Sequence, residues 1–226
     1  MSTSDGLAIA LGTESLRCLP QHALWWPAQR TLFIADVHLG KAASFRAAGV
    51  ALPSGHSSHD LDRISTLLSR FEIARLVILG DLVHARTSYT DALNCNFRVF
   101  RTRHHTVDMV LVRGNHDRHA GEAPIEWRLR VVAEPFTLGP FACCHEPDVS
   151  ASHAGSGIEL CGHLHPALRV QTAREGITLP CFWLRQQGLV LPAFGSLTGK
   201  YVVQLQAHES AIVVAGQHLH HISHRR

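Results

Sequence analysis

The stretch Thr31-Leu-Phe-Ile-Ala-Asp36-Val-His38 places an apolar run directly before two polar side chains. The same arrangement recurs where residues 76–79 lead to Asp81, residues 107–112 lead to Asn115 and residues 141–144 lead to His145. Each run is short, partly β-branched and bounded by glycine, proline or polar residues, which is typical of a buried strand. The pattern therefore predicts strands over residues 31–35, 76–79, 107–112 and 141–144.

Two segments between these runs have apolar residues at helical spacing and predict helices over residues 61–71 and 91–103. We expect His59-Asp60 to cap the first helix at its N-terminus. Strands that alternate with helices form βαβ units, so we expect a mainly parallel sheet with right-handed crossovers.

After Gly162 the pattern changes to short strand-like pieces between turn residues, at residues 168–171, 181–184, 189–191 and 201–205. These pieces predict a second sheet, mixed or antiparallel, packed on the first. The expected fold class is therefore α/β, with two packed mixed β-sheets flanked by helices. No repeat or linker divides the chain, so we expect one domain over residues 1–226 with a histidine-rich C-terminal tail at about 217–226.

The composition is that of a globular enzyme. Apolar residues make up 46% and charged residues 17% of the 226 residues, which excludes a largely disordered chain. The apolar runs are too short to cross a bilayer and the N-terminus has no secretory pattern, so we expect a cytoplasmic protein without a membrane partner. A net charge of +3 neither requires nor excludes nucleic acid as a partner.

Cysteine and histidine are the residue types that most often bind metals. The six cysteines form no C-x-x-C pair, which favours reduced core cysteines over a zinc ribbon or a disulfide framework. Of the 18 histidines, several lie in the tail, which we expect to be solvated because no acidic or cysteine ligand accompanies them. The tryptophans Trp25, Trp26, Trp127 and Trp183 are expected to pack in the core rather than to stack on bases.

Polar side chains at the strand ends form a candidate metal site, because ligands collect beyond the carboxyl ends of strands in open α/β sheets. In extended backbone the pairs Asp36/His38 and His163/His165 would each project to one face, with Cα atoms about 6.6 Å apart. The expected ligands are Asp36, His38, Asp81, Asn115, His145, His163 and His165. The alternative is a set of unrelated surface or capping residues, against which the complete ordered set argues.

The donor set and its charge indicate the chemistry. Carboxylate, imidazole and amide oxygen without thiolate suit two divalent metal ions, with manganese favoured and iron or zinc as alternatives. Two such ions outweigh the charges of Asp36 and Asp81 even after a hydroxide bridges them, so the site would attract a negatively charged phosphoester. In two-metal sites the ions lower the pKa of a bridging water and clamp the attacking and leaving oxygens. Hydrolysis then needs no nucleophile from the protein.

His116 follows the expected ligand Asn115, so in extended backbone its side chain would leave the opposite face and reach the leaving oxygen. We expect His116 to act as general acid, oriented by Asp117, although a structural histidine bonded to Asp117 is the alternative. Five further residues are candidates for contact with substrate phosphates, against solvated surface charge or, for His84, a turn cap. They are Lys41, Arg46, His84, Arg86 and Arg118.

The motifs D-x-H, G-D, G-N-H-D, a lone H and G-H-x-H, in this order from Leu32 to Pro166, resemble the calcineurin-like metallophosphoesterase superfamily. The resemblance implies a four-layer αββα sandwich. It also implies that His116 faces the substrate and that Asp81 bridges the two metals. By the same resemblance, Asp36, His38 and His165 would bind one metal, and Asn115, His145 and His163 the other.

Longer signatures narrow the resemblance. They are Ala35-Asp-Val-His-Leu-Gly-Lys41, Phe45-Arg46, Gly49-Val-Ala-Leu-Pro53, Gly80-Asp-Leu-Val-His84, Gly162-His-Leu-His-Pro166 and Leu191-Pro-Ala-Phe-Gly195. These are similar to bacterial ligase-associated DNA-damage-response phosphoesterases, which implies a metal-dependent phosphodiesterase or endonuclease acting on DNA in repair. Its implied partners are a DNA ligase, a helicase and an exonuclease. Thr198-Gly199-Lys200 departs from the Thr-Gly-Gly expected there, which leaves the role of this loop open.

Two other functions remain as alternatives at this point. The same centre could act on a small substrate, such as a phosphomonoester, a cyclic nucleotide or a sugar-nucleotide pyrophosphate, because the motifs bind a phosphoryl group and not what it carries. A non-catalytic interaction module with a relic metal site is the second. The presence of His116 beside a complete ligand set argues against it.

Overall fold

The computed structural model describes residues 6–148, 157–171 and 176–224. Its first sheet has seven strands in the order β1-β2-β3-β4-β5-β6-β7. They are β1 (Leu7–Leu11), β2 (Glu14–Leu19), β3 (Ala23–Trp26), β4 (Thr31–Ile34), β5 (Arg75–Leu79), β6 (Asp108–Val112) and β7 (Arg130–Val132). Strands β4 to β7 pair in parallel, as the βαβ pattern predicts, whereas β1 to β4 pair antiparallel.

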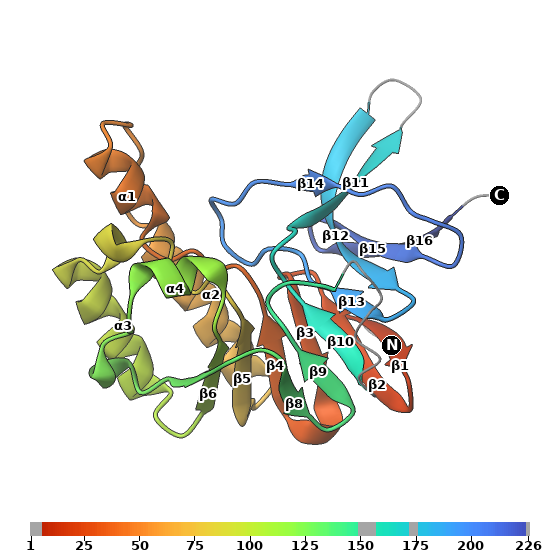
Figure 1. Ribbon diagram of the computed structural model, residues 1–226, viewed down its shortest axis with the longest axis horizontal. Coiled ribbons are helices and arrows are strands. Elements are labelled where there is room, and N and C mark those ends of the chain that lie inside the picture. The colour runs from red at the N-terminus through yellow and green to blue at the C-terminus, as the bar shows by residue number, and fades with distance from the viewer. Residues whose placement is uncertain (1–5, 149–156, 172–175, 225–226) are drawn as a thin grey trace.

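Helices cover one face of this sheet (Figure 1). They are α1 (Lys41–Ala47), α2 (His56–Arg70), α3 (Asp91–Arg103) and α4 (Asn115–Ala120), with short 3-10 turns η2 (Pro27–Gln29), η3 (Arg86–Ser88) and η4 (Ile125–Trp127). The range of α3 is the predicted one, but α2 begins earlier than expected. Its N-cap is Gly55, and the carboxylate of Asp60 lies inside the helix, where it accepts hydrogen bonds from Arg63 and Ser196.

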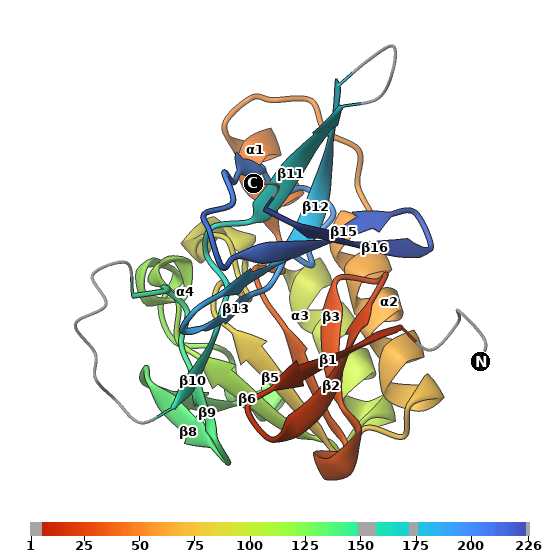
Figure 2. The same cartoon turned by 90° about the vertical axis from the view of Figure 1, so that its right-hand side faces the viewer.

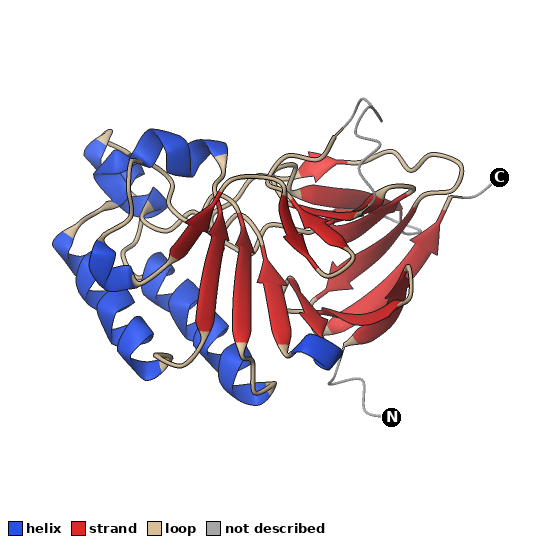
Figure 3. Cartoon of the chain, turned by 60° about the horizontal axis from the view of Figure 1, so that its bottom comes forward, coloured by secondary structure: helices blue, strands red, loops and turns tan. Residues whose placement is uncertain are grey.

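Within the described residues the second sheet has nine strands, and it lies against the other face of the first (Figures 1 and 3). They are β8 (Phe136–Leu138), β9 (Phe141–Cys143), β10 (Ile158–Cys161), β11 (Pro166–Gln171), β12 (Gly176–Arg185), β13 (Gly188–Val190), β14 (Tyr201–Val202), β15 (Ser210–Ala215) and β16 (His218–Ser223). Parallel pairs, such as β9 with β10, occur beside antiparallel ones, such as β12 with β15, so this sheet is mixed as predicted.

Two apolar cores hold the layers together. Phe33, Phe141 and Phe182 are fully buried between the sheets, and Phe97 and Trp127 are buried between the first sheet and its helices. Their burial confirms the α/β fold with two packed mixed sheets and flanking helices. Within the described ranges every helix precedes β7, on the first-sheet side, so the helix layer expected outside the second sheet is not found there.

The expected C-terminal tail is a strand. β16 pairs with β15 along the edge of the second sheet (Figure 2), where Leu219 packs against the core between the sheets and Ile222, on the opposite face of the strand, packs against the smaller cluster around Cys181 and Val213. His218, His220 and His221 therefore face solvent from an ordered strand. Among the described residues, no helix is long and apolar enough to cross a membrane.

Candidate metal centre

All of the predicted metal ligands lie just beyond the carboxyl ends of strands. Asp36 and His38 follow β4, Asp81 follows β5, Asn115 begins α4 after β6, His145 follows β9, and His163 and His165 follow β10. The first four come from the first sheet and the last three from the second. The centre therefore lies where the two sheets meet, near the N-terminus of α4 (Figure 1).

The ligand atoms form two adjoining groups. The donor atoms of Asp36, His38 and His165 all lie within 4.8 Å of one another, and so do those of Asp81, His145 and His163. Asp81 contacts both groups, because its Oδ2 atom lies 3.4 Å from Nε2 of His145 and 3.9 Å from Nε2 of His38. This position between the groups is the one that a bridging carboxylate would need.

Two observations show that these residues fit divalent cations. The Oδ1 atom of Asp36 is buried without any hydrogen-bond partner, although it lies 3.4 Å from Nε2 of His165. Nδ1 of His145 lies 3.1 Å from the carbonyl oxygen of Leu79, to which it donates, so Nε2 of the neutral ring carries a lone pair. That lone pair faces the amide oxygen of Asn115 at 2.8 Å. A cation would satisfy all of these acceptors at once.

The backbone at these ligands is not extended, as their spacing in the sequence predicts, but left-handed. Asp36, His38, Asp81, His163 and His165 have φ angles of 54°, 50°, 52°, 68° and 50°. This left-handed conformation costs roughly 1–2 kcal/mol for a residue with a Cβ atom. The two pairs thus converge on the centre because the chain turns sharply at each ligand, rather than because alternate side chains of a strand share a face.

Two glycines let the loops approach one another. A Cβ atom at Gly162 would lie 2.7 Å from Cβ of Ala35 and 2.8 Å from Oδ2 of Asp36. At Gly80, where φ is 79°, a Cβ atom would collide with the imidazole ring of His145. Side chains at either position would therefore separate the first sheet from the second at the centre.

His116 lies on α4 rather than in extended backbone, and its ring is oriented by a different group from the one predicted. Its Nδ1 atom lies 2.7 Å from the carbonyl oxygen of His84, to which it donates, which leaves Nε2 free for a substrate oxygen. Asp117 instead accepts hydrogen bonds from the backbone N–H groups of Asp81, Gly114 and Val83, at 2.8, 3.0 and 3.1 Å. The carboxylate of Asp117 therefore holds the loops together and does not orient His116.

Burial controls the protonation of His38 and His84. It lowers the pKa of His38 to about 3, although the charge of Asp81 opposes the shift. It also lowers the pKa of His84 to about 4, helped by the positive charge of Lys41. At neutral pH both rings are therefore uncharged, and a neutral imidazole is the form that binds a metal or accepts a proton.

The predicted phosphate-binding residues fall into two sets. His84 lies near the centre, with its Nδ1 atom 3.5 Å from Nδ1 of His38, and Lys41 is half-buried at the start of α1. Arg46 donates to the carbonyl oxygens of Leu52 and Pro53, while Arg118 pairs with Glu134 and Glu146 at 3.4 and 3.9 Å. Arg86 is exposed on η3. His84 and Lys41 thus lie by the centre, whereas the side chains of Arg46 and Arg118 bind other groups of the protein.

Two contacts to the centre were missed from the sequence. Oε2 of Glu134 accepts a hydrogen bond of 2.7 Å from the backbone N–H of His145, and so fixes the loop that carries this ligand. Arg63 donates to the carbonyl oxygen of Phe194, whose own N–H bonds to Ala35 beside the first ligand. Arg63 and Phe194 are 131 residues apart, and Glu134 reaches His145 only because β8 and β9 pair between them, so neither contact could be inferred from a local pattern.

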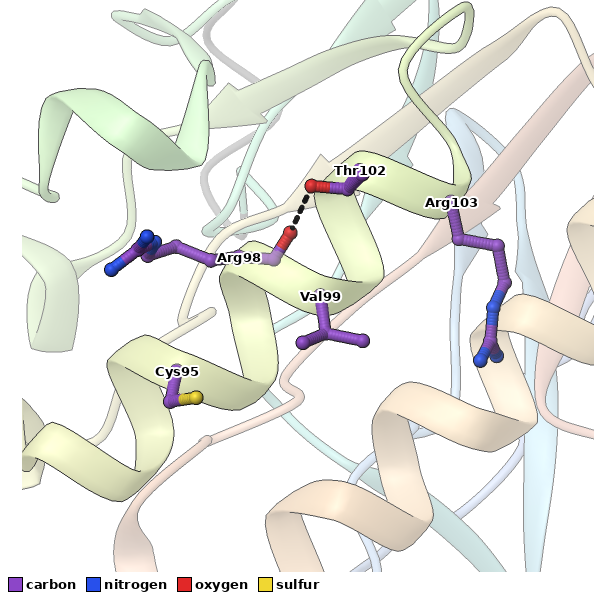
Figure 4. A pocket seen from close by; sticks show the side chains of 5 residues that line it. All are labelled: Cys95, Arg98, Val99, Thr102 and Arg103. Atoms are coloured by element: carbon purple, nitrogen blue, oxygen red, sulfur yellow. Dashed lines mark hydrogen bonds between the residues drawn. The ribbon is translucent and has the colours of Figure 1, made fainter.

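A surface pocket on α3 lies apart from this centre (Figure 4). It is lined by Cys95, Arg98, Val99, Thr102 and Arg103, none of which was predicted to bind a metal or substrate. The hydrogen bond drawn there is an ordinary helix contact from the hydroxyl group of Thr102 to the carbonyl oxygen of Arg98.

The geometry of the centre agrees with a comparison against protein families, in which the model for the calcineurin-like phosphoesterase matches residues 29–178. The chain belongs to the calcineurin-like phosphoesterase family. As a member, it is a metal-dependent phosphoesterase, and the match spans every predicted ligand and His116. A search of curated protein sequences found no match.

A search of solved structures matches this calcineurin-like phosphoesterase to two further proteins, among others. The nuclease MPE of Pseudomonas putida is 36% identical with a TM-score of 0.80, and the alignment covers 93% of this chain and 96% of the nuclease. The phosphoesterase YfcE of E. coli is 15% identical with a TM-score of 0.41, covering 85% of this chain and 98% of the other. The first of these likenesses agrees with the predicted ligase-associated phosphoesterase type.

Proposed function

We propose that this phosphoesterase is a two-metal phosphodiesterase that cleaves DNA. The observation that carries the proposal is the pair of adjoining ligand groups, joined through Asp81 and containing the unpartnered Oδ1 atom of Asp36. The likeness to a nuclease over almost the whole chain supports DNA as the substrate.

Asp36, His38 and His165 would hold one divalent cation, and Asn115, His145 and His163 the other, with Asp81 between them. When bound, the cations supply an activated water and positive charge for the phosphoryl group. The donors are oxygens and imidazoles without thiolate, which favours manganese, with iron or zinc as alternatives.

The residues around the cations have separate tasks. Nδ1 of His116 donates to the carbonyl oxygen of His84, so the ring can act as general acid only when Nε2 also carries a proton, and this second proton is the one that passes to the leaving oxygen. The ammonium group of Lys41 and the ring of His84 would contact the non-bridging phosphate oxygens. Asp36 and His145 are 0% exposed, so the carboxylate and the ring are kept away from bulk water.

The wider role follows from the family resemblance. We propose that the protein acts in the cytoplasm in DNA repair, beside a DNA ligase, a helicase and an exonuclease. Support comes from the signatures Ala35-Asp-Val-His-Leu-Gly-Lys41 and Gly49-Val-Ala-Leu-Pro53 and from the likeness to nuclease MPE.

The test is a substrate panel with purified protein and added Mn²⁺. An aryl phosphodiester, an aryl phosphomonoester, single-stranded DNA and double-stranded DNA are compared, with Asp81→Asn as the inactive control. Cleavage of the diester and of DNA, lost in the variant, is the expected result. Turnover of the monoester alone would reject the nuclease and favour a small phosphorylated substrate.

A further inference from the structure

Three rings form a stack that leads from the surface to the metal centre. The ring of Phe45 lies 6.0 Å from that of His84 with 27° between their planes, and His84 lies 4.9 Å from His116 with 24° between theirs. His116 is the proposed proton donor, so the stack begins on the side of the leaving group. Its outer member, Phe45, is an aromatic side chain that remains 38% exposed.

We propose that Phe45 is a base-binding subsite, on which a nucleobase of the substrate strand stacks. The inference rests on the proposed action on DNA, and it names a residue that would set the preference for nucleotide substrates. Every base has a π-face, so an aromatic platform holds bases without regard to their sequence. The rings of His84 and Phe45 would then continue the stack of the bound bases.

The helix that carries Phe45 is anchored, so the ring has a defined position. Oγ of Ser44 lies 3.0 Å from Oγ1 of Thr87 and 3.1 Å from Oγ of Ser88, which ties α1 to η3. The backbone N–H of Gly40 donates to Oγ of Ser57 at 2.9 Å. A pre-positioned ring loses little freedom when a ligand binds, which favours stacking.

The charges around Phe45 match those of a nucleotide strand. Residues 40–59 contain Lys41 and Arg46 but neither aspartate nor glutamate. Nζ of Lys41 lies 6.0 Å from the centre of the Phe45 ring, on the helix turn nearest the metal centre. A cation beside an aromatic platform, with no opposing carboxylate in the segment, suits a phosphate beside a base.

The stack also predicts which substrates reach the subsite. The ring of His84 lies between the rings of Phe45 and His116. The small leaving group of an aryl diester, held at His116, therefore does not extend to Phe45. The nucleosides that follow a scissile phosphate in DNA do extend that far. The effect of Phe45 should therefore depend on the length of the substrate.

The experiment compares kcat and KM for a DNA oligonucleotide and for bis-p-nitrophenyl phosphate, with the Mn²⁺-loaded enzyme. Phe45→Ala and Phe45→Leu should raise KM for the oligonucleotide by about 5- to 150-fold, the effect of one lost stacked base. Phe45→Tyr, which keeps an aromatic ring, should leave KM for the oligonucleotide close to that of the unaltered enzyme. Val50→Ala is the matched control, because Val50 is 48% exposed on the same segment but is not aromatic.

Four outcomes overturn the proposal. An equal loss on both substrates would mean that Phe45 only supports His84, and a loss of kcat without a rise in KM would mean the same. Full activity of Phe45→Leu on DNA would show that packing, not stacking, matters. If the unaltered enzyme cleaves the aryl diester but not DNA, the proposed action on DNA is wrong and so is this inference. That result is obtained without the variants, so it is distinguished from a failure of the Phe45 subsite alone.

Discussion

The Nε2 atom of His145 lies 2.8 Å from the Oδ1 atom of Asn115, while Nδ1 of the same ring donates to the carbonyl oxygen of Leu79. With a neutral ring, two lone pairs would face each other across this distance. Burial opposes a second proton on His145, but its hydrogen bond to Asp81 and the charges of Asp81 and Asp36 raise the pKa of the ring to about 9. In the metal-free protein a proton therefore occupies the place that a cation would take.

Metal binding should consequently release a proton. At pH 7.5, below the pKa of about 9, His145 is protonated in the metal-free protein, and it must lose that proton to become a ligand. Calorimetric titration with Mn²⁺ in buffers of different ionisation enthalpy should show release of about one proton, and apparent affinity should rise with pH up to about 9. His145→Asn should abolish the release. Binding that is independent of buffer and pH would contradict this assignment.

Two substitutions should separate metal binding from proton transfer. Asp81→Asn removes the charge between the two ligand groups, so both metal content and activity should be lost. His116→Ala should keep the metals and lower kcat by about 10²- to 10⁴-fold, the usual effect of a lost proton donor. Metal analysis of the purified variants beside rates on an aryl diester gives both quantities. An equal loss of metal in the two variants would show that His116 is itself a ligand.

Asp117→Ala should destabilise the protein rather than act on the chemical step alone. The substitution leaves the backbone N–H groups of Asp81, Gly114 and Val83 without their acceptor. Unsatisfied buried donors cost about 1–3 kcal/mol each, so the free energy of unfolding should fall by several kcal/mol. Denaturant unfolding beside His116→Ala, which should be close to normal in stability, measures this. Normal stability with lost activity would instead support the catalytic role predicted from the sequence.

Gly195→Ala should disturb the metal loop from a position that contributes no ligand. A Cβ atom there would collide with the carbonyl oxygen of Val37, between Asp36 and His38. A displacement of about 1 Å at an active site can cost about 10²-fold in rate, and we expect a loss of that size with reduced metal content. Gly199→Ala is the matched control, because a Cβ atom there has nothing within 4 Å. Equal effects of the two substitutions would disprove this steric explanation.

Strands β4, β5, β6 and β9 could be predicted from the sequence because each consists mainly of apolar residues, whereas the parallel strand β7 (Arg130–Val132) was not predicted because it has only two apolar residues, both partly exposed. β4, β5, β6 and β9 lie within one residue of the predicted ranges. The antiparallel hairpin of β1 and β2 was missed, since Leu7–Leu11 and Glu14–Leu19 mix exposed and buried residues over a few positions. β16 could not be predicted because its two apolar residues, Leu219 and Ile222, are three positions apart and show no period-2 alternation among the exposed histidines.

The site was predictable in its residues more than in its geometry. Motif and position at strand ends identified the residues that the structure brings together. The left-handed backbone at Asp36 and His38 could not be predicted, because nothing local distinguishes it from a strand end. The partners of Asp117 are backbone groups from three segments, and only the tertiary structure brings those together.

The ligands come from both sheets, and this has a consequence for how the enzyme matures. The backbone N–H of His163 bonds to Oδ2 of Asp36 across 127 positions of sequence, so the centre forms only after the two sheets have docked. A chain still emerging from the ribosome, even with its first sheet folded, has no complete centre with which to hydrolyse a phosphoester. Cations that bind afterwards favour the docked state by mass action. Hydrolytic activity therefore appears only in a chain whose two sheets have both folded and docked.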